Sequence, residues 1–169
     1  MHVENRIEIG HWEGDTIVGL GQKSAIATVV ERKTRYTFIL YLKDRKSETV
    51  TYEMAKHLNS LNPEIRKSMT YDNGMEMANH KWLTTQTGME IYFAHPYSPW
   101  ERGTNENTNG LIRRYFPKKT DFNTITEQQL KKVQEKLNNR PRKILKYKTP
   151  AYMMELEINK INYQNFKLN

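Results

Sequence analysis

Apolar and β-branched residues alternate with polar ones along the first quarter of the chain, a pattern typical of β-strands. Three segments carry it: residues 7–18, 24–31 and 36–42. The polar run Arg32-Lys33-Thr34-Arg35 separates the last two segments and predicts a tight turn between antiparallel strands. The pattern therefore predicts an antiparallel meander of three strands.

From Ser47 the apolar spacing changes to that of an amphipathic helix, which residues 47–61 continue until Pro63 prevents its extension. Short strands are predicted at residues 68–72 and 89–94, with a helix at 79–87 between them and Gly88 at its end. Residues 95–103 contain two prolines and a glycine, which predicts irregular structure. Helices are then expected at 105–115 and 126–138.

This order of elements predicts an α/β fold with a mixed five-stranded sheet and helices packed on it. The 169 residues fit one domain with its own core, and no repeat or interior linker divides residues 1–169. A Met followed at once by strand-like sequence suggests a piece of a longer protein.

Composition narrows the classes of function. Hydrophobic residues make up 37% and charged residues 27%, as in a soluble globular protein. The apolar runs are too short to cross a bilayer, and no signal peptide opens the chain. The absence of cysteine excludes disulfides, thiolate metal sites and cysteine nucleophiles, and is compatible with the cytosol.

The net charge of +8 is concentrated in one segment. Between Arg113 and Lys148 there are 12 Lys and Arg residues against 3 Asp and Glu residues. The rest of the chain holds 15 Lys and Arg residues and 16 Asp and Glu residues. This asymmetry favours a polyanionic partner, nucleic acid first and an anionic membrane surface second, although a solvated helix face is the plain alternative.

Three acidic residues fall where a metal site at one sheet edge would need them. Asp15 lies on the first predicted strand, Asp72 ends the fourth, and Glu106 opens the helix after the Pro/Gly-rich segment. If the first and fourth strands are neighbours, Asp15 and Asp72 come together. Carboxylate oxygens are the hard ligands that Mg²⁺ and Mn²⁺ prefer, and two such ions can support phosphodiester chemistry.

Each acid also has a structural alternative. Glu13 shares a strand face with Asp15, since side chains two positions apart point the same way, so either could be the ligand. Asp72 precedes Asn73-Gly74 and could bond the amides of a turn. Glu106 in a first helical turn could simply complement the helix dipole. The residues alone leave these interpretations open.

A second group of residues has the chemistry to hold DNA. Prolines and a glycine around a tryptophan suggest an active-site flap. Asparagines are poor helix formers, so their presence in a predicted helix suggests a role such as hydrogen bonding to DNA. Packing, capping and solubility are the alternatives. The predicted DNA contacts are Trp100, Arg102, Asn105, Asn109, Arg113, Arg114, Lys118 and Lys119. His11 and His95 are expected to be structural.

Three local motifs resemble a known family. The segments GHWEGD at 10–15, YDNG at 71–74 and HPYSPWERGTNEN at 95–107 resemble those of bacterial insertion-sequence-thirty family transposases, which have a retroviral-integrase core. Asp72 and Glu106 are separated by 33 residues, the spacing of this family's Asp-Asp-Glu signature. The resemblance extends from about Glu4 to Met153.

The resemblance implies a ribonuclease-H-like fold, a three-strand antiparallel meander plus two parallel strands, with helices on both faces. It implies an Asp-Asp-Glu polynucleotidyl transferase in which Asp15, Asp72 and Glu106 bind two Mg²⁺ or Mn²⁺ ions when DNA is bound. Such a domain would cut DNA at element ends and join the freed 3′-hydroxyl to target DNA. The N-terminal helix-turn-helix region of full-length members is missing here.

The expected partners are double-stranded DNA and further copies of the chain in a homodimer or higher multimer, with no membrane. The expected location is the bacterial cytoplasm, at the nucleoid. Two alternatives stay open: a ribonuclease-H-like nuclease that hydrolyses without joining, and an inactive DNA-binding module.

Overall fold

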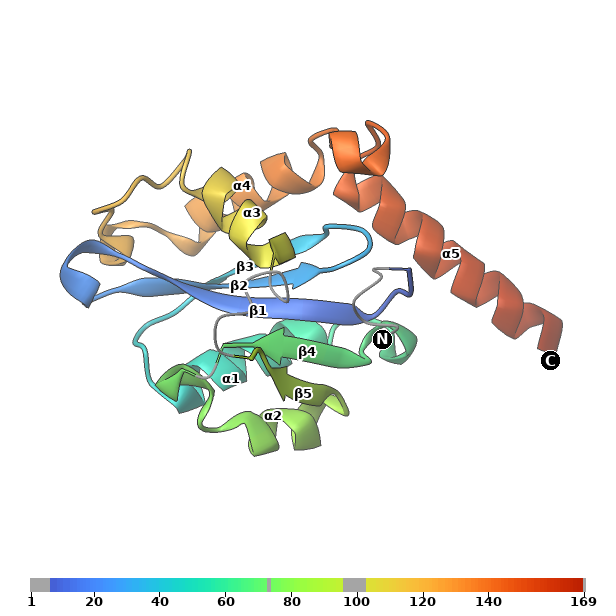
Figure 1. Ribbon diagram of the computed structural model, residues 1–169, viewed down its shortest axis with the longest axis horizontal. Helices are drawn as coiled ribbons and strands as arrows, with labels where there is room; N and C mark the ends of the chain where they lie inside the picture. The colour runs from blue at the N-terminus through green and yellow to red at the C-terminus, as the bar shows by residue number, and fades with distance from the viewer. Residues whose placement is uncertain (1–6, 73, 96–102, 169) are drawn as a thin grey trace.

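A computed structural model describes residues 7–72, 74–95 and 103–168 of the protein (Figure 1). Its strands are β1 (His11–Val18), β2 (Ala25–Glu31), β3 (Thr37–Tyr41), β4 (Ser68–Tyr71) and β5 (Glu90–Phe93). Its helices are α1 (Ser47–Leu58), α2 (His80–Thr87), α3 (Gly103–Ile112), α4 (Glu127–Asn138) and α5 (Pro150–Leu168). Within the described residues, no helix is long and apolar enough to cross a membrane.

One mixed sheet organises the fold, with strand order β3-β2-β1-β4-β5. β1, β2 and β3 pair antiparallel, while β4 pairs parallel with both β1 and β5. The predicted meander, its turn at 32–35 and the neighbouring first and fourth strands are therefore confirmed. The parallel pairs need crossover connections, and α1 and α2 supply them.

Helices cover both faces of the sheet, as predicted (Figure 1). α1 and α2 bury Val50, Met54, Leu58 and Leu83 against one face, which also contains Trp12. α3 and α4 lie on the opposite face over a second apolar cluster. In β2, Ala25, Ala27 and Val29 join the first cluster and Ile26 the second, because successive side chains of a strand point to opposite faces.

The α5 helix was not predicted. It begins at Pro150, whose fixed φ and missing N–H suit the first turn of a helix, and it buries Met154, Glu157 and Ile161. That spacing of three and four residues is a helical signal, but the glutamate within it breaks the apolar stripe. Beyond Ile161 its residues are exposed, and the helix extends past the body of the domain (Figure 1).

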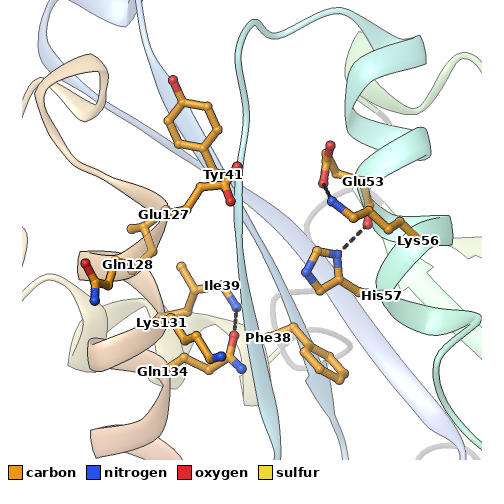
Figure 2. A pocket seen from close by; sticks show the side chains of 11 residues that line it. Phe38, Ile39, Tyr41, Glu53, Lys56, His57, Glu127, Gln128, Lys131 and Gln134 are labelled. Carbon is orange, nitrogen blue, oxygen red and sulfur yellow. Dashed lines mark hydrogen bonds and ion pairs between the residues drawn. The ribbon is translucent and has the colours of Figure 1, made fainter.

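The open edge of the sheet at β3 is protected by polar side chains of α4. Ile39 N donates to Gln134 Oε1 at 2.9 Å, while Asn138 accepts from Thr37 N and donates to Thr37 O, both at 2.9 Å. Figure 2 shows the groove beside this edge, between α1 and α4, with a volume of about 410 Å³. Its lining mixes polar and apolar side chains and includes none of the three predicted metal ligands.

Candidate active site

Asp15 and Asp72 lie on adjacent strands. The parallel pairing of β1 with β4 runs from His11 opposite Ser68 to Glu13 opposite Thr70. The same register continued by two residues sets Asp15 opposite Asp72, immediately beyond the end of β4. Both aspartates are half-buried, so their carboxylates lie at the boundary between the sheet and solvent.

Gly14 and Tyr71 allow this close approach. A Cβ atom added at Gly14 would lie 2.4 Å from Tyr71 Cδ2, too close for any side chain larger than hydrogen. The Tyr71 ring therefore fills the space that the glycine leaves, and its hydroxyl hydrogen-bonds the Thr16 hydroxyl. The glycine between Glu13 and Asp15 is explained by close packing of β1 on β4.

Negative charge is concentrated around the Tyr71 hydroxyl. Burial raises the pKa of Tyr71 far above its ordinary value, and the charges of Asp15, Asp72 and Glu76 raise it further. Glu76 is paired with Arg45 Nη2 at 2.5 Å. Burial acts to raise the pKa of Glu76, but the bond from Arg45 and its own backbone N–H hold that pKa below the ordinary value.

The α3 helix is attached to Asp15. Asn109 Nδ2 donates to Asp15 Oδ2 at 2.7 Å, and Thr16 N donates to Asp15 Oδ1 at 2.9 Å. On β2, Thr28 Oγ1 donates to Asn109 Oδ1 at 3.1 Å. Glu106 lies one turn before Asn109 on the same helix and is exposed. The aspartate thus has a fixed orientation, and the helix that fixes it also carries Glu106.

The three acids do not form a closed cluster. Among residues 7–72, 74–95 and 103–168, no three His, Asp or Glu side chains lie close enough together to hold a metal ion. The structure brings Asp15 and Asp72 to one place and leaves Glu106 nearby on α3 without joining them. The segment 96–102, which leads into α3, lies outside the described residues.

Glu13 is occupied elsewhere. It is fully buried, its Oε2 accepts the backbone N–H of Asn105 at 2.7 Å, and its Oε1 lies 3.0 Å from Arg32 Nε. The contact with Arg32 is an ion pair whose angle falls short of hydrogen-bond geometry. Glu13 shares a strand face with Asp15, as expected, but both of its oxygens face protein groups.

The predicted DNA contacts differ in their surroundings, and one of them, Asn109, is bonded to Asp15 and Thr28 as described above. Asn105 is fully buried and its Oδ1 accepts from Thr28 Oγ1 at 2.9 Å, which contradicts a DNA contact. Arg113 donates to Val18 O at 2.7 Å, and burial lowers its pKa below the ordinary value. The exposed members are Arg114, Lys118 and Lys119. Trp100 and Arg102 lie outside the described residues.

His11 has structural partners: its Nδ1 lies 2.7 Å from Ser68 Oγ and its Nε2 lies 3.2 Å from Glu8 Oε2. The contact with Ser68 joins β1 to β4, whereas Glu8 precedes β1; a structural role for His11 stays a prediction. His95 is exposed and directly precedes the segment outside the described residues.

Known proteins share both the sequence and the fold of this chain. The integrase core domain family matches residues 5–99. The chain belongs to this family. Its relatives include transposase InsI of insertion sequence element IS30C from Escherichia coli (strain K12), with 52% identity over 91% of this chain. The transposase of insertion sequence element IS1086 from Cupriavidus metallidurans is 41% identical over 90% of the chain.

The resemblance to insertion-sequence-thirty transposases is thereby confirmed. The chain spans only 40% of the InsI transposase and 45% of the IS1086 transposase.

Solved structures confirm the ribonuclease-H-like fold. The catalytic core domain of BIV integrase superposes with a TM-score of 0.68 at 18% identity, over 92% of this chain and 99% of that one. A chain of the simian T-cell lymphotropic virus intasome, in complex with PP2A regulatory subunit B56 gamma, superposes with a TM-score of 0.65 at 19% identity. This match covers 83% of the present chain and 52% of that one. The integrase core domain therefore keeps its architecture at low identity.

The sequence signals around the acids were incomplete. Glu13 is predicted as a competing ligand because strand periodicity shows that its side chain lies on the same face as Asp15. Periodicity does not show which groups of other elements contact that side chain. Arg32 and Arg35 were read only as turn residues. Three cations, Arg32, Lys33 and Arg35, stand in the short turn after β2, and every residue of β2 is buried. This concentration of charge beside a buried strand is the signal for a buried role of the two arginines.

Proposed function

We propose that this chain is the single catalytic domain of a DNA transposase. In this proposal it cleaves phosphodiesters at the ends of an insertion element and transfers the 3′-hydroxyl into target DNA. The observation that carries the proposal is the β1–β4 register, which sets Asp15 opposite Asp72, together with the bond from Asn109 that ties the Glu106 helix to Asp15. Kinship with transposases over most of the chain supports it.

Members of the integrase core family generally use divalent metal ions. Three carboxylates form an all-oxygen donor set, which suits Mg²⁺ or Mn²⁺ and does not suit softer metals. We infer that Asp15, Asp72 and Glu106 hold such ions, two of them when DNA is bound. Bound ions would supply an activated nucleophile and stabilise charge on the leaving oxygen.

The protein's own groups prepare this site. Asn109 and Thr16 each donate one hydrogen bond to the Asp15 carboxylate, so its oxygens hold one orientation. The Tyr71 phenol, whose pKa is raised, stays protonated and neutral behind the acids. Glu106 would complete the set by moving or extending toward the aspartates.

DNA would lie across this edge of the sheet. Arg114, Lys118 and Lys119 are exposed cations that follow α3 in the chain, and in the proposal they contact the phosphate backbone. Trp100 and Arg102 are proposed to press on DNA from the preceding loop. Asn109 and Arg113 would act mainly by holding Asp15 and the end of β1.

The active assembly is proposed to be a homodimer or higher multimer on double-stranded DNA, working at the nucleoid of a bacterial cytoplasm. A structural neighbour belongs to an intasome, which supports assembly on DNA. The chain spans only 40% of the InsI transposase, and in the proposal recognition of the element ends uses segments outside that part.

The test is cleavage and joining of labelled element-end DNA with Mn²⁺. The Asp72→Asn variant should lose cleavage while keeping DNA binding, because it removes a metal ligand and no phosphate contact. The control variant Glu155→Gln changes an exposed acid of α5, a helix that carries none of the three acids, and should cleave normally. Normal cleavage by Asp72→Asn would overturn the metal assignment. Nicking without joined product, with the remaining segments restored, would favour a nuclease.

A further inference from the structure

The first turn of α3 has an unusual partner. The first N–H groups of any helix lack acceptors within the helix and need others. Asn105 is the third residue of α3, and its N–H donates to Glu13 Oε2 at 2.7 Å. The acceptor comes from the middle of β1, 92 positions earlier in the chain. A carboxylate at this end of a helix also interacts favourably with the helix dipole.

Glu13 cannot move freely in this position. Its side chain is completely buried, and the Arg32 guanidinium, also buried, lies against its other oxygen at 3.0 Å. The backbone of Arg32 is tied to the same strand, since its N–H donates to His11 O at 2.9 Å. A buried carboxylate with a cation on one side and a helix N–H on the other has one stable orientation.

The neighbouring turn holds the same end of α3. Arg35 Nη1 donates to Thr104 Oγ1 at 2.5 Å, so two successive residues of the first turn of α3 contact the sheet. Arg35 has a φ of 65°, in the left-handed region that side chains other than glycine rarely adopt. The start of α3 is therefore held by Glu13 from β1 and by Arg35 from the turn before β3.

The next residue after Asn105 is Glu106. Glu13 and Asp15 lie two apart on the same face of β1, and α3 contacts both: Asn105 binds the first and Asn109 the second. These two contacts, one helical turn apart, set the position of α3 along β1. They also set how far the Glu106 backbone lies from the Asp15 carboxylate.

We propose that Glu13 is a positioning residue: through the Asn105 N–H it fixes the start of α3 so that Glu106 reaches the metal ions held by Asp15 and Asp72. This inference rests on the proposed function. It assigns the first acid of the GHWEGD segment, Glu13, to the helix and the second, Asp15, to the metal. Asp15 is half-buried at the boundary with solvent, whereas Glu13 is fully buried with both oxygens against protein groups.

The experiment compares Glu13→Gln and Glu13→Ala with the matched variant Glu31→Gln. Glu31 is equally buried and binds Gly10, Lys33 and Thr34 at the same turn, but its hydrogen bonds include none to α3. Three properties are measured for each: Mn²⁺ affinity by titration, amide hydrogen exchange of residues 103–112 without metal, and the Mn²⁺ dependence of DNA cleavage.

The expected result is a graded one. Glu13→Ala should speed exchange at the start of α3 and weaken Mn²⁺ binding by about tenfold, the usual scale for residues that orient metal ligands. Excess Mn²⁺ should restore cleavage. Glu13→Gln, which keeps an oxygen for Asn105 N–H, should lie between Glu13→Ala and the native chain. Glu31→Gln should lower the melting temperature and leave Mn²⁺ affinity and α3 exchange unchanged.

Two results would overturn the inference. One is native Mn²⁺ affinity in Glu13→Ala despite faster exchange in α3. The other is an equal loss of Mn²⁺ affinity in Glu31→Gln, which would reveal general destabilisation. Failure of the proposed function looks different: Glu106→Gln would then bind Mn²⁺ as the native chain does, while the exchange measurement would still report whether Glu13 holds α3.

Discussion

Helices α3 and α4 lie on the same face of the sheet, yet they are held by opposite means (Figure 1). α4 buries Leu130, Val133 and Leu137 in an apolar cluster. α3 turns Thr104, Asn105 and Thr108 toward the sheet, all of them buried, and contributes Ile112 only at its end. Hydrogen bonds to β1, β2 and the 32–35 turn replace apolar packing along α3.

The two helices also begin differently. α4 has a capping box of its own, in which the Thr126 side chain accepts from Gln129 N and the Gln129 side chain accepts from Thr126 N. The N–H of Asn105 in α3 depends on Glu13 of a distant strand. Apolar packing is tolerant of small shifts, whereas hydrogen bonds have narrow geometry. A helix that positions a ligand therefore gains precision from polar contacts, and α4 supplies stability.

The largest expected effect tests the stabilising role of α4. Leu137→Ala should lower the free energy of unfolding by roughly 2–5 kcal/mol, because Leu137 is fully buried and its truncation leaves a cavity. Denaturant unfolding measures the loss, which should appear in the exchange of all helices on this face. A loss confined to α4 would mean that this helix docks independently of the core.

The next effect tests the polar attachment of α3. Thr28→Val keeps the side-chain volume but removes the hydroxyl that donates to Asn105 and Asn109, which should cost about 1–3 kcal/mol. Asn105 Nδ2 already has no hydrogen-bond partner within the described part of the chain, so this side chain would lose its remaining bond. Hydrogen exchange should quicken in α3 before α4.

The control for Thr28→Val lies on α3 itself. Thr108 is equally buried, but its hydroxyl donates only to Thr104 O within the same helix. Thr108→Val should therefore leave α3 attached and DNA cleavage close to native. Similar behaviour of the two variants would show that the hydroxyl contacts to β2 do not hold α3.

A smaller effect is expected at the local cap. Thr126→Ala removes the capping side chain of α4 and should cost about 1 kcal/mol. Faster exchange should be confined to the first turn of α4, and Mn²⁺ affinity should not change. A change in Mn²⁺ affinity would contradict the division of roles between the two helices.

The smallest effect concerns the ion pairs of α5. Burial acts to raise the pKa of Glu157, but hydrogen bonds from Lys33 and Lys160, each at 2.9 Å, hold it below its ordinary value of 4.5. The contribution of these ion pairs to the stability of the fold is therefore complete above pH 4.5. It is lost as the pH falls through the lowered pKa of Glu157. Because both lysines are partly exposed, it should stay below about 1 kcal/mol.

Exchange of α5 amides against pH measures this contribution. α5 should loosen in acid, and Glu157→Gln should remove that acid dependence and loosen α5 already at neutral pH. The exposed neighbour Glu155 provides the control, since Glu155→Gln should leave the acid dependence unchanged. An acid transition that persists in Glu157→Gln would assign it to another group.

Much of the fold followed from local pattern. The strands and helices through Asn138 were predicted with ends close to those observed, since periodicity, Pro63, Gly88 and the Thr126 cap are local signals. α5 was missed because Glu157 interrupts its apolar stripe, and its burial depends on Lys33 of a distant turn together with Lys160 of the same helix. Asn105 was assigned to DNA because an asparagine in a helix looks functional, whereas its burial depends on Thr28 of a distant strand.

The sequence by itself determined the α/β class, the meander, the neighbouring strands that carry Asp15 and Asp72, and the kinship with transposases. Each of these depends on short-range periodicity, on topology rules or on motifs that survive in the linear chain. Only the tertiary structure showed that Glu13 is fully buried against Arg32 and the start of α3, whereas Asp15 is half-buried beside the end of β4. Two acids on one strand face are equivalent in the sequence, and they become different when Arg32 and the start of α3 close over one of them.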